Sequence, residues 1–477
     1  MSDYWATFGV DLHLDLDPAA GRRGGLEAGL RDAIRAGRLA PGTRLPSTRA
    51  LAGEVGLARG TVTAVYDQLT AEGYLIARRG AGTEVAALSG SLAPAPPNPQ
   101  EPPEPRHDLR PGRPDVSAFP TAAWLRAYRR ALNAAPAAVY GYGDPAGRIE
   151  LRTTLADYLG RTRGVSASPD RIVITTGFVQ ALALLARVLR DEGVAVMAME
   201  DPGLPFHRDV VTRAGMPITP LPVDGHGARA DLLATAEHAR TGAVVVTPVH
   251  QYPVGATLHP SRRHTLAQWA RTTSAVVIED DYDGEFRYDR QPVGALQGMA
   301  PDQVVYLGTA AKTIGPALRL AWMVLPRPLV APIVEAKRHA DHQTETLGQL
   351  ALADLLTSHV YDRHVRACRL RYRRRRDILL TRLAALSSDE AFRVHGIAAG
   401  LQALITLPTG VEEDDVLDRA AREGLAIDGL AEHYHDSHAQ ASQHPPGIIV
   451  GYGTPSEHTY PAALDALVRV LAEVRRG

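Results

Sequence analysis

Lysine is almost absent from this chain, and the two lysines that remain are candidates for chemistry. Of 52 lysine and arginine residues, only Lys312 and Lys337 are lysine. The bias toward arginine and alanine is typical of GC-rich coding sequences, in which arginine replaces lysine wherever any cation serves. A neutral amine attacks a carbonyl carbon, whereas a guanidinium does not. We therefore expect a retained lysine to supply a reactive amine. For Lys312, the alternative is a surface lysine that happens to follow a strand.

An apolar run at residues 275–280 ends in carboxylates. In VVIEDDYDGEF, Asp280 and Asp281 follow the hydrophobic residues directly, and Tyr282 comes next. Side chains at the carboxyl end of such a strand face the crevice where α/β proteins bind ligands. These residues are therefore candidate binding groups, and either aspartate could face the ligand. A metal site or simple solvation would also place acids at a strand end.

A strand-to-helix junction in ITTGFVQAL adds a candidate phosphate site. Gly177 and Phe178 would begin the helix, where unpaired backbone N–H groups and the helix dipole favour an anion. Such junctions are common, so this motif by itself identifies no ligand.

Short apolar strands separated by helical segments must position these residues. We predict strands at residues 171–175, 194–198, 243–247, 275–280 and 304–308. Their pattern predicts a parallel or mixed sheet that helices cover on both faces. A long arginine-rich helix is expected at 360–383, and a smaller α/β unit follows it. Residues 108–477 are thus predicted as one α/β domain, with a large part at about 135–355 and a small part at about 375–477.

The first 87 residues predict a different domain. Helical segments at 24–38, 47–55 and 58–72 precede short strands at 74–78 and 83–87. This order is typical of a winged helix-turn-helix. From Arg22 to Thr83 there are ten arginines, five acids and no lysine, a net charge of about +5 that suits a DNA-binding surface. The alternative is a small helical interaction domain with a solvated basic face.

Seven prolines between Pro94 and Pro105 separate the two regions. Such a segment is a semi-rigid, polyproline-like spacer. We therefore predict a multidomain protein with a winged helix at 1–87, a proline-rich linker at 88–107 and an α/β domain at 108–477.

Composition restricts the cellular setting. Cys368 is the only cysteine, so no disulfide can form within the chain, as expected in a reducing compartment. The N-terminus lacks the pattern of a signal peptide, and no run approaches the roughly 20 apolar residues of a membrane span. We expect a soluble cytoplasmic protein that has no membrane partner.

The segment from Leu39 to Leu75 resembles the GntR-type winged helix through LAPGTRLP, STRALAGEVG and ARGTVTAVYDQLTAEGYL. The resemblance implies that phosphates are contacted by Arg44, Ser47 and Arg49, the major groove by Arg59, Thr61 and Thr63, and the region of the minor groove by Arg79 and Gly80. Arginine can read guanine bidentately, and phosphate contacts position such a module. Ala58 departs from the pattern, because Ser or Thr usually caps the recognition helix.

Residues 108–477 resemble fold-type I enzymes that use pyridoxal 5'-phosphate (PLP), and specifically the aminotransferase-like domain of the MocR/GabR-like (PdxR-like) regulators. With the winged helix and linker, the resemblance covers the whole chain. The motifs that carry it are YLGTAAKTIGPALRLAW, VVIEDDYDGEF, ITTGFVQAL, HQYPVG and YGYGDPAG. It implies that PLP is the cofactor and that Lys312 forms a Schiff base, an aldimine, with it.

The same resemblance implies roles for eight further residues. The PLP phosphate would be held by Arg319, Thr309 and the backbone of Gly177 and Phe178. Asp280, rather than Asp281, would pair with the pyridinium nitrogen, and Tyr282 would hydrogen-bond the ring 3-hydroxyl. Tyr252 stands near that hydroxyl, where aminotransferases usually have Asn. Tyr142 would reach the phosphate of the other subunit, so a homodimer is implied.

Three departures from the family pattern concern the site. Ala311 stands where these regulators often have Ser, and Leu204 stands where they usually have an aromatic residue. Ile449 replaces the Arg that binds a substrate carboxylate in true aminotransferases, so an α-amino acid would lack its bidentate partner. Arg208 is a candidate substitute.

The resulting hypothesis is a bacterial transcription regulator that binds double-stranded operator DNA as a homodimer and is nucleoid-associated when bound. It would sense PLP or an amine or amino-acid effector through the aldimine at Lys312, without efficient turnover. A working aminotransferase with an accessory DNA-binding domain is the alternative. A third possibility is a DNA-binding protein whose inactive PLP fold serves only to dimerise.

Two further clusters have structural interpretations. A metal site at His433, His435, His438 and His444 has irregular spacing, so no metal is predicted. The run RLRYRRRRD at 369–377 is interpreted as a solvated helix face or an interdomain contact, with DNA contact as the alternative.

Overall fold

Apolar residues at helical spacing build the core of the N-terminal unit. The computed structural model describes residues 21–78, 82–87, 104–288, 293–386, 392–435 and 445–474, and its contacts divide the chain into the units Met1–Pro103 and Glu104–Gly477. In the first unit, Leu26, Leu30 and Ile34 of one helix pack against Val62, Val65 and Leu69 of another.

The elements of this unit confirm the predicted winged helix-turn-helix. Its helices are α2 (Gly21–Arg35), α3 (Thr48–Glu54) and α4 (Arg59–Ala71), and its strands are β1 (Leu75–Arg78) and β2 (Gly82–Val85). The strands form an antiparallel hairpin that pairs Leu75 with Val85 and Arg78 with Gly82. The predicted wing residues Arg79 and Gly80 lie outside the described residues.

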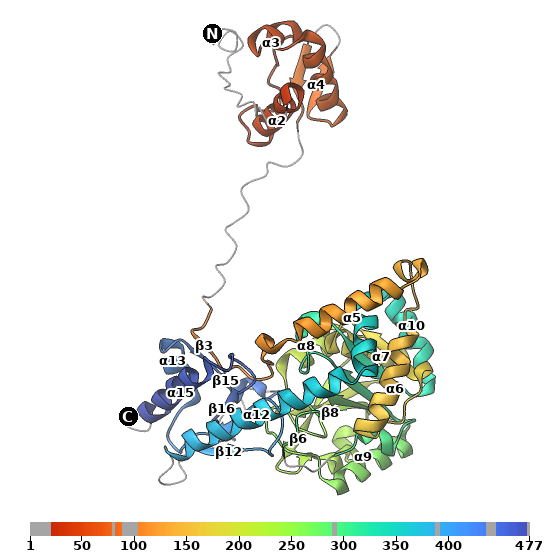
Figure 1. The fold of residues 1–477 in the computed structure, drawn as a ribbon, viewed down its shortest axis with the longest axis vertical. Coiled ribbons are helices and arrows are strands. Elements are labelled where there is room, and N and C mark those ends of the chain that lie inside the picture. The colour runs from red at the N-terminus through yellow and green to blue at the C-terminus, as the bar shows by residue number, and fades with distance from the viewer. Residues whose placement is uncertain are drawn as a thin grey trace. The chain divides into compact units, whose positions relative to one another are not determined.

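An eight-stranded mixed sheet forms the centre of the second unit (Figure 1). In spatial order its strands are β4 (Ile172–Thr175), β11 (Ala321–Val324), β10 (Val304–Thr309), β9 (Val276–Asp281), β8 (Thr241–Val246), β5 (Val196–Asp201), β6 (Ile218–Asp224) and β7 (Gly227–Ala228). Strands β10, β9, β8, β5 and β6 are parallel neighbours, so their carboxyl ends share one edge. Strand β11 runs antiparallel to β10 and β4.

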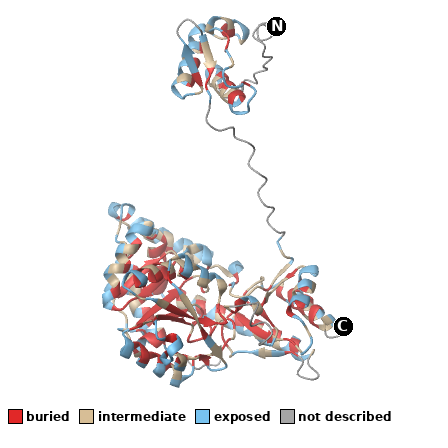
Figure 2. Ribbon diagram, turned by 180° about the vertical axis from the view of Figure 1, so that it is seen from behind, coloured by how far each residue is buried: buried red, intermediate tan, exposed pale blue. Residues whose placement is uncertain are grey.

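Helices cover both faces of this sheet, as the sequence predicts. The helices of this part are α5 (Thr121–Ala134), α6 (Ile149–Arg163), α7 (Phe178–Asp191), α8 (Pro205–Arg213), α9 (Pro260–Thr273), α10 (Arg327–Asp341) and α11 (Thr346–Thr357). Alternate strand residues face opposite layers: Ile172 and Ile174 pack in a cluster with α6 and α11, whereas Val173 packs with α7 and α10. Figure 2 shows that the strands are the buried centre of this unit.

A smaller antiparallel sheet lies beside the long helix α12 (Val360–Ala384). Its strand order is β12 (Arg393–His395), β13 (Gln402–Thr406), β16 (Gly447–Gly451) and β15 (Asp428–Gly429). Helices α13 (Glu413–Arg422) and α15 (Tyr460–Val474) complete this small subdomain, together with the parallel pair β3 (His107–Asp108) and β14 (Leu425–Ala426). The fold class predicted from the sequence is thus confirmed.

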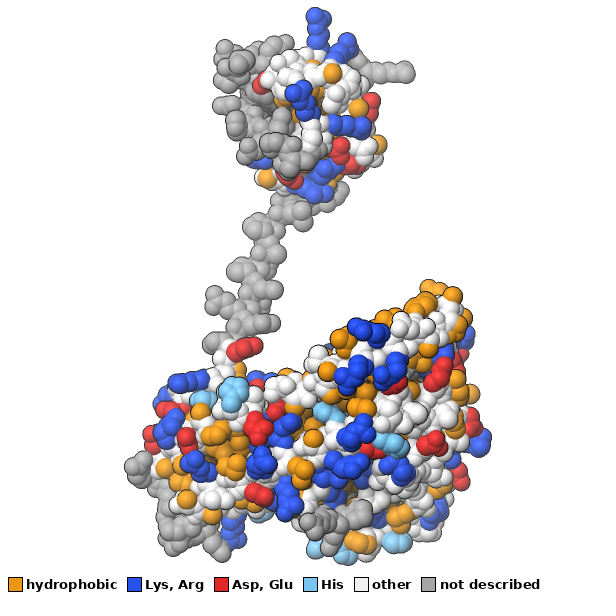
Figure 3. All heavy atoms as spheres, viewed as in Figure 1, with side chains coloured by type: hydrophobic (Ala, Val, Ile, Leu, Met, Phe, Trp, Pro, Cys, Tyr) orange, Lys and Arg blue, Asp and Glu red, His pale blue; other side chains and the backbone are white. Residues whose placement is uncertain are grey.

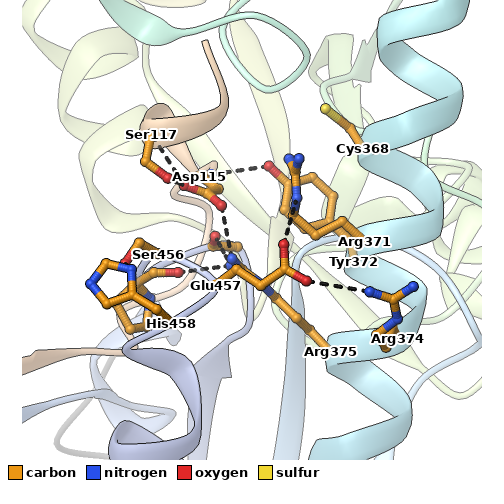
Figure 4. Close-up of polar contacts among 12 residues, drawn as sticks. Asp115, Ser117, Cys368, Arg371, Tyr372, Arg374, Arg375, Ser456, Glu457 and His458 are labelled. Atoms are coloured by element: carbon orange, nitrogen blue, oxygen red, sulfur yellow. Dashed lines mark hydrogen bonds and ion pairs between the residues drawn. The ribbon is translucent and has the colours of Figure 1, made fainter.

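A buried ion pair fastens the first residues of the second unit to α12. Arg375 Nη2 donates to Asp115 Oδ2 at 2.8 Å, and both side chains are only 3% exposed. Arg375 Nη1 also donates to the carbonyls of Gly453 and Pro455, and the hydroxyl of Tyr372 accepts from the Asp115 amide. Figure 4 shows these side chains converging. The pair therefore joins three separate parts of the chain.

Replacement of Arg375 by Met is expected to destabilise the second unit by about 3–5 kcal/mol, because the buried Asp115 carboxylate loses its only ionic partner among the described residues. Urea unfolding would measure the loss. The matched control is Arg374→Ala, since Arg374 is 70% exposed and pairs with Glu457 at 3.3 Å. That exposed pair should contribute less than about 1 kcal/mol. Equal effects of the two substitutions would contradict the assignment.

Among the described helices, none has the length and apolar character needed to cross a lipid bilayer.

Candidate functional site

A cavity of about 330 Å³ lies at the carboxyl ends of strands β5, β8, β9 and β10. It brings together eight of the nine residues that the sequence predicts for the cofactor. These are Lys312, Asp280, Tyr282, Arg319, Thr309, Gly177, Phe178 and Tyr252. The ninth, Tyr142, is 88% exposed, lies outside the cavity and stacks on His342 with 4.7 Å between ring centroids.

Lys312 follows β10 and points its amine into the cavity. Its Nζ donates to the carbonyl of Gly112 at 2.6 Å, and both residues line the wall. Burial lowers the pKa of Lys312, against the opposing attraction of Asp280 and Asp283. A lowered pKa increases the fraction of neutral amine, the form that attacks a carbonyl carbon.

The two aspartates at the end of β9 have different surroundings. Asp281 is paired with Arg163 at 2.7 and 2.9 Å and accepts from the Tyr306 hydroxyl at 2.7 Å. Asp280 lines the cavity, and among the described residues no side chain or backbone group hydrogen-bonds its carboxylate. Burial, reinforced by Asp281, holds the pKa of Asp280 well above its usual value. A cation in the cavity beside Asp280 would lower this pKa and stabilise the ionised carboxylate.

A free guanidinium occupies the other end of the cavity. Arg319 has φ +52° and reaches the loop before α7, where a Cβ on Gly177 would lie 2.7 Å from its Nη2. Gly177 has φ +131°, so glycine is required there for both conformation and space. Within the described chain Arg319 has no acidic partner. Together with the unpaired amides at the start of α7, this guanidinium can bind an anion.

The hydroxyl of Tyr282 is held from two sides. It donates to the carbonyl of His250 at 3.1 Å and accepts from Gln402 Nε2 at 2.7 Å. His250 Nδ1 in turn lies 2.8 Å from Asp283 Oδ2 in a pair that is almost completely buried. The small subdomain thus fixes a cavity residue through Gln402, a contact that sequence reasoning missed because the two positions are 120 residues apart.

Thr309 lines the cavity, and its hydroxyl is bound locally. Its Oγ1 accepts from the Ala311 amide at 3.0 Å and lies 3.4 Å from the Leu320 carbonyl.

Tyr252 contacts a histidine from the small subdomain. His433 Nδ1 donates to the Gly429 carbonyl at 2.9 Å, so its Nε2 is the acceptor for the Tyr252 hydroxyl at 3.0 Å. Burial lowers the pKa of His433 to about 4. The ring is therefore neutral near pH 7, as this hydrogen bond requires.

Acidification is expected to destabilise the protein through His433. Its folded pKa of about 4 lies below the unfolded value of 6.5. As pH falls through this window, only the unfolded chain takes up the proton, so stability is present above pH 6.5 and lost toward pH 4, by about 3 kcal/mol. His433→Gln should flatten the pH dependence of urea unfolding between pH 7 and 4. An unchanged slope would show that His433 does not titrate as described.

The departures from the family pattern concern the arginine that would bind a substrate carboxylate in addition to Arg319. Leu204 and Ala311 line the wall, whereas Ile449 is buried in an apolar cluster with Leu404, Leu430 and Tyr434. Arg208 lines the cavity, but its Nη1 donates to the carbonyls of residues 203 and 433 and its Nη2 donates to those of residues 432 and 434. Arg208 therefore fastens the 431–434 turn and is a poor substitute for the missing arginine.

Two wall residues were missed by the sequence analysis. Glu200 ends β5 as Asp280 ends β9, so the same strand-end rule could have found it; burial raises its pKa to about 7, and it accepts from the Thr247 hydroxyl at 2.5 Å. His207 stacks on Phe178 with centroids 4.5 Å apart, and burial lowers its pKa to about 3. It offers a neutral aromatic surface three residues after Leu204.

The N-terminal unit presents its predicted DNA-contacting residues on the outside. Arg44, Ser47, Arg49, Arg59 and Thr63 are exposed, and Thr61 is half-buried. Ser47 caps α3, its Oγ accepting from the Ala50 amide, whereas Ala58 supplies no side-chain cap to α4. Figure 3 shows basic side chains projecting from this unit.

The arginines of the N-terminal unit fall into two groups. Arg31 pairs with Glu27 and Glu72, and Arg78 pairs with Glu84. In the described part of the unit, Arg44, Arg49 and Arg59 have no such acidic partner. These three predicted contact arginines therefore remain available to phosphates and bases.

The arginine run at 369–377 and the histidine cluster have different surroundings in the structure. Arg375 of the α12 run is buried in the subdomain contact, whereas Arg373 and Arg374 are exposed. His433 binds Tyr252, and His438 and His444 lie outside the described residues. Within the described ranges, no three His, Cys, Asp or Glu side chains are arranged to hold a metal ion.

Comparison with family models assigns both units. Residues 23–85 match the model of bacterial regulatory proteins of the gntR family, and residues 112–414 match that of aminotransferase class I and II. The chain is 32% identical to the HTH-type pyridoxine biosynthesis transcriptional regulator PdxR of Corynebacterium glutamicum, over 93% of each chain. It is 33% identical to the probable rhizopine catabolism regulatory protein MocR of Rhizobium meliloti, over 92% of each.

Solved structures similar to this chain include aminotransferases. An archaeal alanine:glyoxylate aminotransferase matches 77% of this chain and 91% of its own, with a TM-score of 0.70 and 25% identity. A kynurenine aminotransferase from Pyrococcus horikoshii in complex with PMP matches 77% and 90%, with a TM-score of 0.68 and 25% identity. The second unit therefore has the fold-type I architecture predicted from the sequence.

Proposed function

The chain belongs to the bacterial transcription regulators that join a GntR-type winged helix to an aminotransferase class I and II domain, and from this premise we propose that it binds operator DNA under the control of PLP or an amine effector at Lys312. Aminotransferases of this class depend on PLP, so PLP is the expected cofactor. One observation carries the proposal: an unpaired acid, a buried lysine and an unpaired arginine line a single cavity.

The charges of the cavity fit PLP at both ends. Asp280 is a buried carboxylate without a hydrogen-bond partner in the described chain, and it suits the protonated ring nitrogen. Arg319, beside Gly177 and the start of α7, suits the phosphate. Lys312 lines the same cavity as both and is the only lysine of its wall. When bound, PLP supplies an aldehyde that bonds amines reversibly and a ring that withdraws electrons.

The protein's own residues have four tasks in this proposal. Lys312 supplies the amine that holds the cofactor and that an incoming amine displaces. Asp280 keeps the ring nitrogen protonated, and Tyr282 orients the ring through its hydroxyl, itself held by Gln402. Arg319, Thr309 and the backbone of Gly177 and Phe178 hold the phosphate. Tyr252, whose hydroxyl bonds to His433, would lie near the ring 3-hydroxyl.

A homodimer is part of the proposal. Tyr142 is exposed and outside the cavity of its own chain, as required of a side chain that reaches the phosphate of a second copy. Exposed apolar residues Leu125, Tyr140 and Ile149 lie on the neighbouring segments and suit such a contact.

Regulation requires two states with different affinities for DNA, because a ligand that binds both equally shifts nothing. We place the regulator in the bacterial cytoplasm, on the nucleoid when it binds its operator. The test is a gel-retardation assay on the DNA upstream of its own gene, with and without PLP and candidate amines. The expected result is a specific complex whose affinity depends on these ligands. No retardation of that DNA in any condition would overturn the proposal.

Aminotransferase turnover is the competing function, and the site argues against it. Ile449 is buried in an apolar cluster, and the Nη groups of Arg208 are bound to four carbonyls. A substrate carboxylate thus has no evident bidentate partner in the cavity. Amino acids should exchange with Lys312 without sustained release of keto acid. Steady keto-acid production with many amino acids would instead favour the enzyme.

A further inference from the structure

The second lysine of the chain, Lys337, is completely buried on α10, although its neighbour Arg338 is exposed. Its Nζ donates to Asp341 Oδ1 at 2.7 Å. Because arginine is the default cation of this chain, a buried lysine indicates a position that arginine does not serve.

Two further hydrogen bonds connect this ion pair to the loop that precedes α7. Gln180 Nε2 donates to Asp341 Oδ2 at 2.6 Å, and Gln180 Oε1 accepts from the Thr176 amide at 2.9 Å. A carboxylate can only accept and an N–H can only donate, so the Gln180 amide has a single possible orientation. These hydrogen bonds form a relay from Lys337 through Asp341 and Gln180 to the Thr176 amide, and each donor and acceptor in it is fixed.

The end of this relay is the anion-binding end of the cavity. Thr176 immediately precedes Gly177, which gives Arg319 its space and is the N-cap residue of α7. The Thr175 hydroxyl also donates to the Gly177 carbonyl at 3.2 Å. The position of the Gly177 loop thus depends on the Thr176 amide, and through it on Gln180.

The same end of α10 also holds the segment that carries Tyr142. The carbonyl of Asp341 accepts from the Gln343 amide at 2.7 Å, and Gln343 Oε1 accepts from the Gly143 amide. His342 stacks on Tyr142. Both segments assigned to the phosphate are therefore anchored where α10 ends.

Arginine at position 337 would break this arrangement while preserving its charge. A guanidinium presents five N–H donors in a planar fork and binds both oxygens of a carboxylate. At Asp341 it would compete for Oδ2, the oxygen that Gln180 uses. Lysine donates to Oδ1 and leaves Oδ2 to Gln180.

We propose that Lys337, Asp341 and Gln180 are positioning residues for the PLP phosphate, an inference that rests on the proposed function. They touch neither the cavity nor the reacting amine, and they act by fixing the Gly177 loop. The selectivity of the site for PLP over pyridoxal, which lacks the phosphate, should depend on them.

The test compares the affinities of PLP and pyridoxal, read from the absorbance of the aldehyde bound at Lys312. Lys337→Arg and Gln180→Leu should each weaken PLP binding about tenfold, which corresponds to the loss of one hydrogen bond to a charged group. Each should change pyridoxal binding by less than about twofold. Arg338→Lys is the matched control, since it changes a cation one residue away on the exposed face. An unchanged ratio of the two affinities, or an equal loss of both, overturns the inference.

Hydrogen exchange of the cofactor-free protein tests the relay independently of PLP. Amides of residues 175–180 should exchange at least threefold faster in Lys337→Arg than in wild type, with no change in Arg338→Lys. Unchanged exchange overturns the relay. If the proposed function were wrong, the wild type itself would develop no absorbance with PLP, a result that is distinct from the two outcomes above.

Discussion

Lys312→Ala is expected to abolish the visible absorbance that wild-type protein develops with PLP and to weaken PLP binding on the order of a hundredfold. The reason is chemical, since Lys312 is the only amine in the cavity wall and no guanidinium can replace it. Absorbance titration and borohydride reduction measure both effects. Wild-type absorbance should be bleached by borohydride with covalent retention of the cofactor, whereas the variant should retain none.

Lys312→Arg separates the reactivity of the amine from its charge. It keeps a cation opposite Asp280 but supplies no nucleophile, so it should fold normally and remain colourless. DNA binding by both variants should persist, because the residues predicted to contact the operator belong to the other unit, but its response to PLP and amines should disappear. If Lys312→Ala developed the same absorbance as wild type, the aldehyde would be bonded to another residue and the assignment of Lys312 would be wrong.

Arg59→Ala is expected to weaken specific operator binding by about 1–3 kcal/mol, that is, by roughly tenfold to over a hundredfold. Arg59 is the first residue of α4, is exposed and has no acidic partner in the described part of its unit. A side chain that reads a base edge contributes mainly to specific binding, whereas one that contacts a phosphate weakens binding to all DNA and reduces its salt dependence. Fluorescence anisotropy with operator and unrelated DNA at several salt concentrations distinguishes these outcomes.

The control for Arg59 is Arg23→Ala. Arg23 is an exposed arginine of α2 outside the predicted contacts, so its loss removes the same charge with little effect on specificity. PLP binding should be unchanged in both variants. If Arg23→Ala and Arg59→Ala weakened operator binding equally, net charge rather than the recognition helix would account for the affinity.

Sequence patterns predicted the strands well because burial on both faces leaves a clear trace. The runs at 171–175, 243–247 and 275–280 correspond to β4, β8 and β9, which helices cover on both sides. Two short strands of the small subdomain were harder to predict, since β14 and β15 have two residues each and owe their conformation to pairing with β3 and β16. Such short strands carry no periodicity of their own.

In the candidate site, too, the sequence predicted some features and left others undecided. The strand-end rule found Asp280 but could not choose between Asp280 and Asp281, because both end the same strand. Arg163, 118 residues earlier, decides the matter by binding Asp281. Likewise, the role of Arg208 could not be read from its neighbours, since three of its four carbonyl partners lie at residues 432–434.

By itself, the sequence determined the kinds of chemistry available: one amine among arginines, acids at strand ends, a glycine before a helix and a basic helical module. These properties belong to residue types and short spacings, so the linear chain contains them. Only the tertiary structure decided which acid is free, which arginine is occupied and why a second lysine is buried behind the site. Those outcomes depend on partners distant in sequence, and the fold brings them within hydrogen-bonding distance.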